Sequence, residues 1–313
     1  MQIFKKKPHI DFMGRRKLAV VFSALLIVIA IGALVTRGLN FGLDFTGGTL
    51  LEVGYPEAVE LNDLRQALAA ANYGDSVVQH FGTARDVLVR VAPREGVSSS
   101  EVGDTILKVL QAASNGTATM RRQEYVGPQV GDELRDDGGL AMIIALGCIL
   151  VYVMMRFEWR FALGSVAALI HDVLITLGFF ALFQWDFDLT VLAAVLAVIG
   201  YSLNDTIVVF DRIRENFRKM RKTSPLEVVN ISLNQTISRT LVTSLTTLLV
   251  VLAMFFMGGE LIHAFSMALI VGIGVGTYSS IYIASATALA LDVSHTSMVE
   301  VQKEGADQES LIQ

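Results

Sequence analysis

Six apolar stretches, each about as long as a membrane-crossing helix, are the feature that most constrains this chain. A helix needs about 20 apolar residues to cross the ~30 Å hydrocarbon core of a bilayer. The predicted spans are residues 18–35, 140–155, 161–183, 189–210, 237–257 and 261–291. The second is short and is expected to extend at its ends, whereas the sixth is long enough to tilt or to pass the interface.

The composition supports a membrane protein. Hydrophobic residues make up 53% of the 313 residues and charged residues only 18%, and the mean hydropathy is +0.54. Soluble domains carry about 25% charged residues. The net charge of −5, without a basic patch that includes aromatic residues, disfavours nucleic acid as a partner. The single cysteine, Cys148, excludes an intramolecular disulfide.

Basic residues beside the spans predict their orientation, because short cytoplasmic loops are enriched in Lys and Arg. The three basic clusters contain Lys5, Lys6, Lys7, Arg15, Arg16 and Lys17; Arg156 and Arg160; and Arg212, Arg214, Arg218, Lys219, Arg221 and Lys222. The loops on the opposite side, "QWDFD" and "GGE", contain none. Both termini are therefore predicted to be cytoplasmic. The first apolar run exceeds the 7–15 residues usual in a signal peptide, which favours an uncleaved anchor over a cleaved one.

This orientation predicts five parts. They are a cytoplasmic N-terminus (1–17), the first span (18–36), an external domain (37–137), spans two to six (138–291) with a cytoplasmic loop at 211–236, and a cytoplasmic tail (292–313).

The external insert has the pattern of a small α+β domain. The predicted strands are residues 48–55, 76–82, 86–93 and 118–126, and the predicted helices are residues 60–73 and 98–113. The order β-α-β-β-α-β is that of a ferredoxin-like fold. The insert has no cluster of metal-ligating residues and no nucleophile beside a base, and His80 is a lone histidine. It is therefore predicted to be a binding or mechanical module, and no enzyme activity, metal or organic cofactor is expected.

Two glycine-rich segments join the insert to the membrane. They supply the candidate hinge residues Gly42, Asp44, Gly47, Gly48, Gly127, Pro128 and Gly131. Gly42, Gly47 and Gly48 are expected to supply positive φ. The two segments are either plain turns or a double hinge that lets the domain move as a unit.

Polar residues inside the spans are the candidate functional groups, since a charged side chain at the bilayer centre costs about 2.5–3.5 kcal/mol. Asp205 is the foremost, with Asn204 beside it and Gly200 one turn away on the expected shared face. Arg239 lies near the cytoplasmic start of the fifth span. Burial favours the neutral form of a carboxyl, and a nearby guanidinium favours the charged form. Asp205 and Arg239 are thus predicted to form a proton switch; a snorkelling Arg239 is the structural alternative.

Supporting roles are predicted for other residues within the spans. His171, Asp172 and Ser202 are candidate polar partners, although His171 and Asp172 differ by ~100° around a helix, so only one is expected to face a neighbour. Gly200, Gly272 and Gly276 are candidate helix-packing positions. The segment "SPLE" at 224–227 predicts a helix start before the fifth span.

The chain resembles the SecF family, the smaller subunits of the bacterial SecD–SecF export complexes in the resistance-nodulation-division (RND) superfamily. The resemblance rests on "GLDFTGGT", "VGPQVGDELR", "HDVLITLG" and "GYSLNDTIVVFDRIREN", in this order. It implies an inner-membrane subunit that works with SecD and with the SecYEG translocon and its ATPase on an unfolded polypeptide. Protons are the implied coupling ion, with a conduction role for Asp205 and Arg239.

Three rival functions remain open. A passive scaffold between SecD and the translocon would need no titrating residue. An RND-type pump for small molecules or lipids would predict a roomier external domain. An intramembrane aspartyl protease would need paired Asp in YD and GxGD-like contexts, which the "HD" and "ND" sequences around Asp172 and Asp205 do not match.

Overall fold

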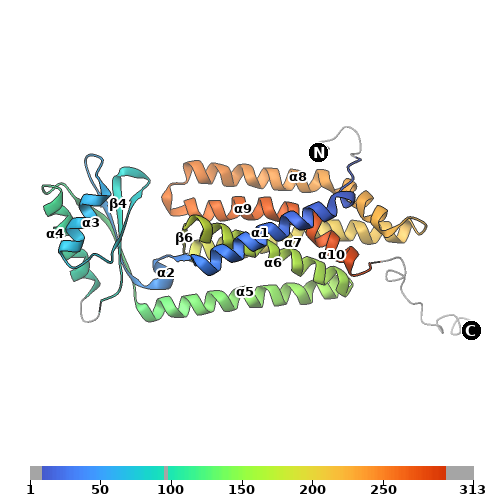
Figure 1. Cartoon of the computed structure of the whole chain (residues 1–313), viewed down its shortest axis with the longest axis horizontal. Coiled ribbons are helices and arrows are strands. Elements are labelled where there is room, and N and C mark those ends of the chain that lie inside the picture. Colours follow the sequence, from blue (N-terminus) through green and yellow to red (C-terminus); the bar gives the residue numbers. More distant parts are fainter. Residues whose placement is uncertain (1–8, 95–97, 294–313) are drawn as a thin grey trace, which may run out of the picture.

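A computed structural model describes residues 9–94 and 98–293. The chain forms a long helical bundle with a small α+β domain at one end (Figure 1). The first helix of the bundle begins, and the last helix ends, at the end away from this domain. Lys5, Lys6 and Lys7 and residues 294–313 of the predicted tail lie outside the described residues.

Within the described residues, six helical segments are long and apolar enough to cross a membrane, as predicted. They are α1 (Arg16–Thr36, preceded by the 3₁₀ turn η1, Met13–Arg15), α5 (Pro128–Arg156), α6 (Trp159–Phe183), α7 (Leu189–Lys219), α8 (Pro225–Met257) and a composite sixth segment. The last combines η2 (Glu260–Ile262), α9 (His263–Ser279), η3 (Ser280–Ala284) and α10 (Ser285–Ala290). The segment η3 is a π-helix, a geometry that often marks functional sites.

Several predicted boundaries were wrong because helices continue through polar sequence. In the predicted loop at 211–236, α7 continues as a helix to Lys219, whereas α8 begins at Pro225, in agreement with the helix start predicted at 224–227. Ser224 caps α8 by accepting a hydrogen bond from the Glu227 N–H, as predicted. Helix α5 includes the whole glycine-rich segment after Gly127, with Pro128 at its first position, where the fixed φ of proline favours helix initiation.

The α+β domain contains β2 (Gly48–Gly54), α3 (Leu61–Ala70), β3 (Val77–Phe81), β4 (Thr83–Val91), α4 (Ser99–Ala113) and β5 (Thr119–Val126). Its sheet has the order β3-β4-β2-β5, and every neighbouring pair is antiparallel. Residues 83–85, which separate the second and third predicted strands, lie within β4. Gly82 alone makes the turn between β3 and β4 with a φ of +73°, which glycine adopts readily.

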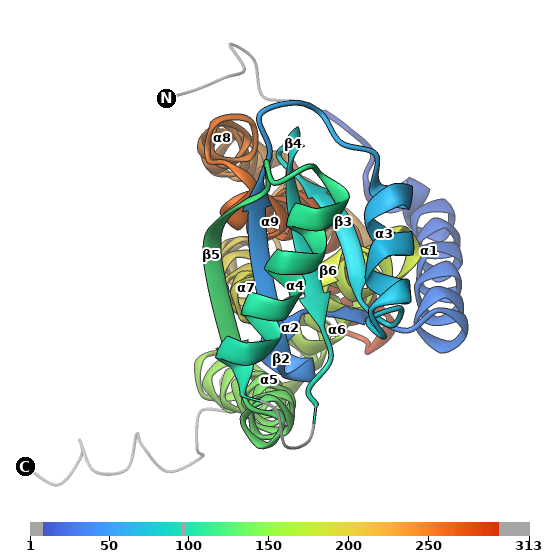
Figure 2. The same ribbon diagram turned by 90° about the vertical axis from the view of Figure 1, so that its left-hand side faces the viewer.

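The two helices of the domain cover the sheet face that points away from the bundle (Figure 2). The core between helices and sheet includes Leu51, Val87, Val89, Ile106 and Leu110, all fully buried. Ser98 caps α4 in a reciprocal capping box with Glu101. The other face of the sheet therefore points toward the bundle.

The junction between domain and bundle is a compact structure that the sequence did not predict. β1 (Asn40–Phe41) pairs in parallel with β6 (Asp186–Phe187), and the short helix α2 (Leu43–Thr46) packs against α5. A Cβ on Gly131 would meet the Gly47 nitrogen at 2.9 Å. The two glycine-rich segments thus pack against each other.

The expectation of positive φ holds for Gly47 (+66°) and Gly48 (+121°) but is wrong for Gly42, whose φ is −68°. Gly42 instead allows a close approach, because a Cβ there would lie 3.0 Å from the Asp188 Cβ.

The segment before α1 is fastened to the start of α8 by two asparagines. Asn234 accepts a hydrogen bond from the Ile10 N–H and donates one to the Ile10 carbonyl, both at 2.8 Å. Asn230 Oδ1 accepts from the N–H groups of Phe12 and Met13. The first span is therefore tied to the fifth at the end of the bundle away from the domain.

Candidate functional site

The centre of the bundle holds a buried carboxylate, Asp172 on α6, whose side chain is 1% exposed. Its Oδ2 accepts hydrogen bonds from Ser202 on α7 (2.5 Å) and Ser279 on α9 (2.8 Å). Its Oδ1 lies 2.9 Å from the His171 Nδ1. Three helices thus meet at one side chain, which has a partner on each oxygen.

The prediction that only one of His171 and Asp172 faces a neighbouring helix was wrong. Both are buried, at 3% and 1% exposure, because α6 packs against α1 on one side and against α7 and α9 on others. The His171 ring stacks on Tyr278 of α9, while Asp172 faces α7 and α9. A helix with neighbours on several sides can bury two adjacent side chains, whose directions differ by ~100° around the helix axis.

Asp205, on α7, is the second buried carboxylate, with 3% exposure. Its two oxygens are 3.4 Å from Thr243 Oγ1 and Ser244 Oγ on α8. Ser244 is in turn 2.7 Å from Thr277 Oγ1 on α9. These contacts to Asp205 are at the long end of hydrogen-bond distances, so its charge has much less compensation than that of Asp172.

Arg239 lies on α8, the same helix as the hydroxyl partners of Asp205, but its side chain is exposed. In the part of the chain that the structure describes, no ion pair of 4 Å or less joins the Arg239 guanidinium to the Asp205 carboxylate. The predicted pair is thus not in direct contact in this conformation; Thr243, one turn along α8, occupies the contact position.

Gly200 and Asn204 share one face of α7, as predicted, but Asp205 is buried on another face, so the expectation that all three point one way was wrong. Gly200 and Asn204 are both exposed, and a Cβ on Gly200 would meet nothing within 4 Å. With Ala193 and Ala197 they form an exposed stripe along α7, spaced as one helix face. We call these four residues the open face of α7. Among the described residues, nothing packs against Gly200 as the predicted packing role would require.

Gly272 and Gly276 lie where α9 crosses α7. A Cβ on Gly272 would come within 2.2 Å of Val198, and one on Gly276 within 3.0 Å of the Ser202 Cβ. The close approach brings α9 near enough for Ser279 to reach Asp172. Sequence reasoning missed Ser279 and Thr277, although Gly272, Gly276 and Ser279 share the i, i+4, i+7 spacing of one helix face.

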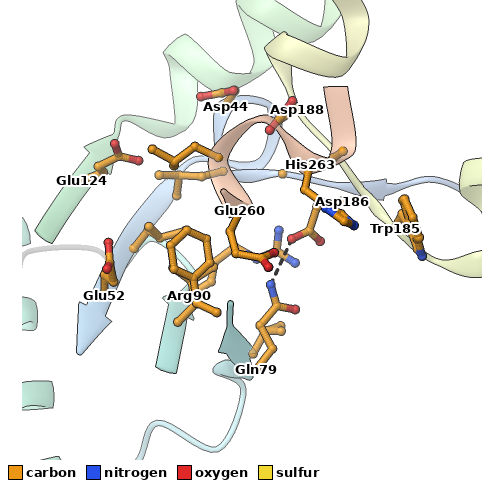
Figure 3. A pocket seen from close by; sticks show the side chains of 18 of the residues that line it. Asp44, Glu52, Gln79, Arg90, Glu124, Trp185, Asp186, Asp188, Glu260 and His263 are labelled. Atoms are coloured by element: carbon orange, nitrogen blue, oxygen red, sulfur yellow. Dashed lines mark hydrogen bonds between the residues drawn. The ribbon is translucent and has the colours of Figure 1, made fainter. Parts of the chain in front are cut away.

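A cleft of about 390 Å³ lies between the sheet and the junction. Figure 3 shows that its side chains come from both parts of the molecule. Gln79 on β3 donates to Asp186 on β6, and Arg90 on β4 donates to the Phe41 carbonyl at 2.8 Å. Few polar contacts therefore join the sheet to the bundle across this cleft.

The cleft is lined by more acidic than basic side chains. The acidic ones are Asp44, Glu52, Glu124, Asp186, Asp188 and Glu260, and the arginines are Arg90 and Arg122. Among the described residues, no group of three or more His, Cys, Asp or Glu side chains is placed to hold a metal ion.

Comparisons with known proteins agree with this arrangement. Residues 105–294 match the family model described as "Protein export membrane protein SecD/SecF, C-terminal", and residues 32–55 match the "SecD/SecF GG Motif". The SecF protein of Vibrio alginolyticus is 54% identical over 98% of both chains. That of Pseudomonas aeruginosa is 52% identical over 94% of this chain and 95% of the relative.

This chain belongs to the SecF family. The crystal structure of SecDF from Thermus thermophilus, described as a translocon-associated membrane protein, superposes with a TM-score of 0.84 at 40% identity. The match covers 92% of this chain and 39% of that one. A second structure, SecDF in a super-membrane-facing form, gives a TM-score of 0.70, and the match covers 99% of this chain and 41% of that one. A SecF chain thus spans about two fifths of these SecDF chains.

Proposed function

We propose that this chain is a non-enzymatic subunit of the Sec export machinery. With SecD, it would use the proton motive force to promote late steps of polypeptide translocation. The observation that carries this proposal is Asp205, a buried carboxylate in an apolar bundle whose hydrogen bonds among the described residues are two contacts of 3.4 Å. Such a residue within a membrane-spanning helix is a functional-site candidate, with protons as the ion that it would exchange.

The open face of α7 supports SecD as the partner. Its residues are small or polar, the kind that favour close helix contacts in membranes. Asp205 lies on the same helix, next to Asn204, so a partner helix on this face would lie close to the proton site. The further partners in this proposal are the SecYEG translocon with its ATPase and the unfolded polypeptide.

The proposed location is the bacterial inner membrane, with both termini in the cytoplasm and the α+β domain in the periplasm. The basic residues Arg156, Arg212 and Arg218 lie at the ends of helices away from the domain, which agrees with the positive-inside rule. The β3-β4-β2-β5 antiparallel order supports a ferredoxin-like class for the domain.

In the proposed mechanism, proton binding at Asp205 changes the packing of α7 against α8. With Asp205 ionised, Arg239 would be drawn toward it; with Asp205 neutral, the hydroxyl contacts suffice. The junction would transmit the rearrangement to the domain, because in the described part of the chain the sheet is held over the cleft by a few polar contacts, those of Gln79 and Arg90. One charge crossing 100 mV supplies about 2.3 kcal/mol, and about 1.4 kcal/mol is a tenfold change in population. One proton can thus bias a two-state element about fiftyfold.

Replacing Asp205 by Asn tests the proposal. Export of a secreted reporter into membrane vesicles that contain SecD and SecYEG should lose its acceleration by the proton motive force. Thr206→Val is the matched control, because Thr206 is buried beside Asp205 and cannot titrate. Export by Asp205→Asn that stays as fast and as sensitive to a protonophore as the wild type would overturn the proton role and leave a scaffold.

A further inference from the structure

In the buried pair His171–Asp172, one ring nitrogen of the histidine has no hydrogen-bond partner among the described residues. Asp172 has partners on both oxygens, and the His171 Nδ1 faces it. The His171 Nε2 is buried and has no hydrogen-bond partner among the described residues. Buried polar atoms are nearly always paired, and each exception needs an explanation.

We propose that His171 and Asp172 form a second proton-holding site, which works in series with Asp205 and couples the proton to the contact of α6 with α7 and α9. The proposal rests on the proposed function, because it concerns the same proton-driven cycle. It adds a second site on a different helix, α6. This site contacts Ser202 of α7, which lies about one helical turn from Asp205.

The chemistry of the pair suits one exchangeable proton. With Asp172 ionised, Nδ1 carries a hydrogen and donates to Oδ1, which leaves the lone pair of Nε2 free. An arriving proton binds to this lone pair and makes the imidazole cationic, while the hydrogen bond at Nδ1 stays in place. The Asp172 carboxylate, 2.9 Å from the ring, compensates the new charge, and Ser202 and Ser279 donate hydrogen bonds to this carboxylate.

The described side chains that contact the pair carry hydroxyl groups. The pair is faced by Tyr278 and Ser279 of α9, by Ser202 of α7 and by α1, where Ser23 donates to the Tyr278 hydroxyl. Asp205 is the next acidic residue along α7, and Arg239 is exposed on α8. Within the described residues, the ion-pair partner of Asp172 at 4 Å or less is His171.

A proton at this site would act on helix packing. Ser202 and Ser279 both donate to the same oxygen of Asp172, so this oxygen links α6 to two other helices. Ser279 directly precedes the π-helical segment η3, where the helical hydrogen-bond register changes. A change of charge at the pair therefore acts on the position where the sixth span is least regular.

The first test compares three variants in vesicles that contain SecD and SecYEG. His171→Asn keeps a donor near the position of Nδ1 but cannot take a second proton, and Asp172→Asn removes the charge at constant volume. Both should lose proton-driven acceleration of export, by up to the about fiftyfold bias of one proton at 100 mV. Thr176→Val is the control: Thr176 is fully buried one turn away and donates to the Asp172 backbone carbonyl, so its loss should leave the acceleration intact.

The outcomes separate this inference from the proposed function. If Asp205→Asn abolishes the acceleration but His171→Asn and Asp172→Asn retain it, the second site is wrong and the proposed function stands. If all three retain it, the proposed function itself fails.

A second measurement decides the matter even if these variants do not fold. His9, His80, His263 and His295 are replaced by Gln, which leaves His171 as the only histidine of the five. Nitrogen NMR of the labelled imidazole, in full-length chain assembled with SecD, should show a neutral ring with the hydrogen on Nδ1 that becomes doubly protonated as the pH falls. A ring that keeps one form throughout would overturn the proposal.

Discussion

Ser202 on α7 donates a hydrogen bond of 2.5 Å to Oδ2 of Asp172 on α6. The same stretch of α7 carries Asp205, less than one turn further on, whose contacts are both 3.4 Å. Two buried acids of one bundle therefore have unequal compensation. Asp172 has the shorter hydrogen bonds, and Asp205 is therefore the less compensated of the two acids.

Ser202→Ala should destabilise the bundle by about 1.5–3 kcal/mol, because it removes a hydrogen bond to a buried charged group. Thermal unfolding of the full chain in detergent measures this. Ser266→Ala is the control, since Ser266 is equally buried but bonds only to the Ile262 carbonyl of the preceding turn. Equal losses for the two variants would show that the Ser202–Asp172 bond contributes nothing specific.

Gly272→Ala should separate α9 from α7. The new Cβ would lie 2.2 Å from Val198, and overpacking of this kind typically costs 1–3 kcal/mol, or ~2 kcal/mol here. Gly274→Ala, two residues along the same helix, meets nothing within 4 Å and should be neutral or slightly stabilising. Melting temperatures of the two variants in the same detergent test the difference, and a stable Gly272→Ala chain would contradict the α7–α9 contact.

Asn230→Ala should release the segment before α1. It leaves the N–H groups of Phe12 and Met13 without the acceptor that both use, at a cost of about 1–3 kcal/mol. Asn230→Asp keeps an acceptor oxygen and is the matched control. Hydrogen exchange of the Phe12 and Met13 amides should accelerate in the alanine variant only; equal protection in both variants would show that the asparagine does not hold this segment.

The sequence was sufficient for features set by local pattern. Length and hydropathy located all six spans. Alternation and helical periodicity located the strands and helices of the domain, and the segment at 224–227 located the start of α8. Boundaries failed at positions such as Arg212 and Gly131, where polar or glycine-rich sequence stays helical because neighbouring elements pack on it. The helical spacing of Gly272 and Gly276 predicted that they pack against another helix, but it did not predict which helix.

The site was only partly predictable for the same reason. Asp205 stood out because a carboxylate in an apolar run is costly, and this depends on the sequence alone. The burial of both His171 and Asp172 depends on how many helices surround α6, which no single-helix pattern encodes. Ser279 was missed because its role depends on α9 approaching α7 at Gly276, a long-range contact.

The stability of the α+β domain should depend on alkaline pH through Tyr55. This side chain is 4% exposed, its hydroxyl has no partner among the described residues, and burial raises its pKa from 10.0 to about 12. Because the folded pKa lies above the unfolded one, the stabilising contribution is complete below about pH 10 and is lost as the pH rises toward 12. The loss should reach about 3 kcal/mol.

Tyr55→Phe removes the titrating group and should abolish this dependence, without a large loss of stability at neutral pH because the hydroxyl is unpaired. Tyr125→Phe is the control, since Tyr125 is 54% exposed. Denaturant unfolding of the full chain at about pH 9 and about pH 11 gives the comparison, with tyrosinate absorbance to follow the titration itself. A Tyr55→Phe chain that loses as much stability as the wild type over this interval would show that other groups cause the alkaline transition.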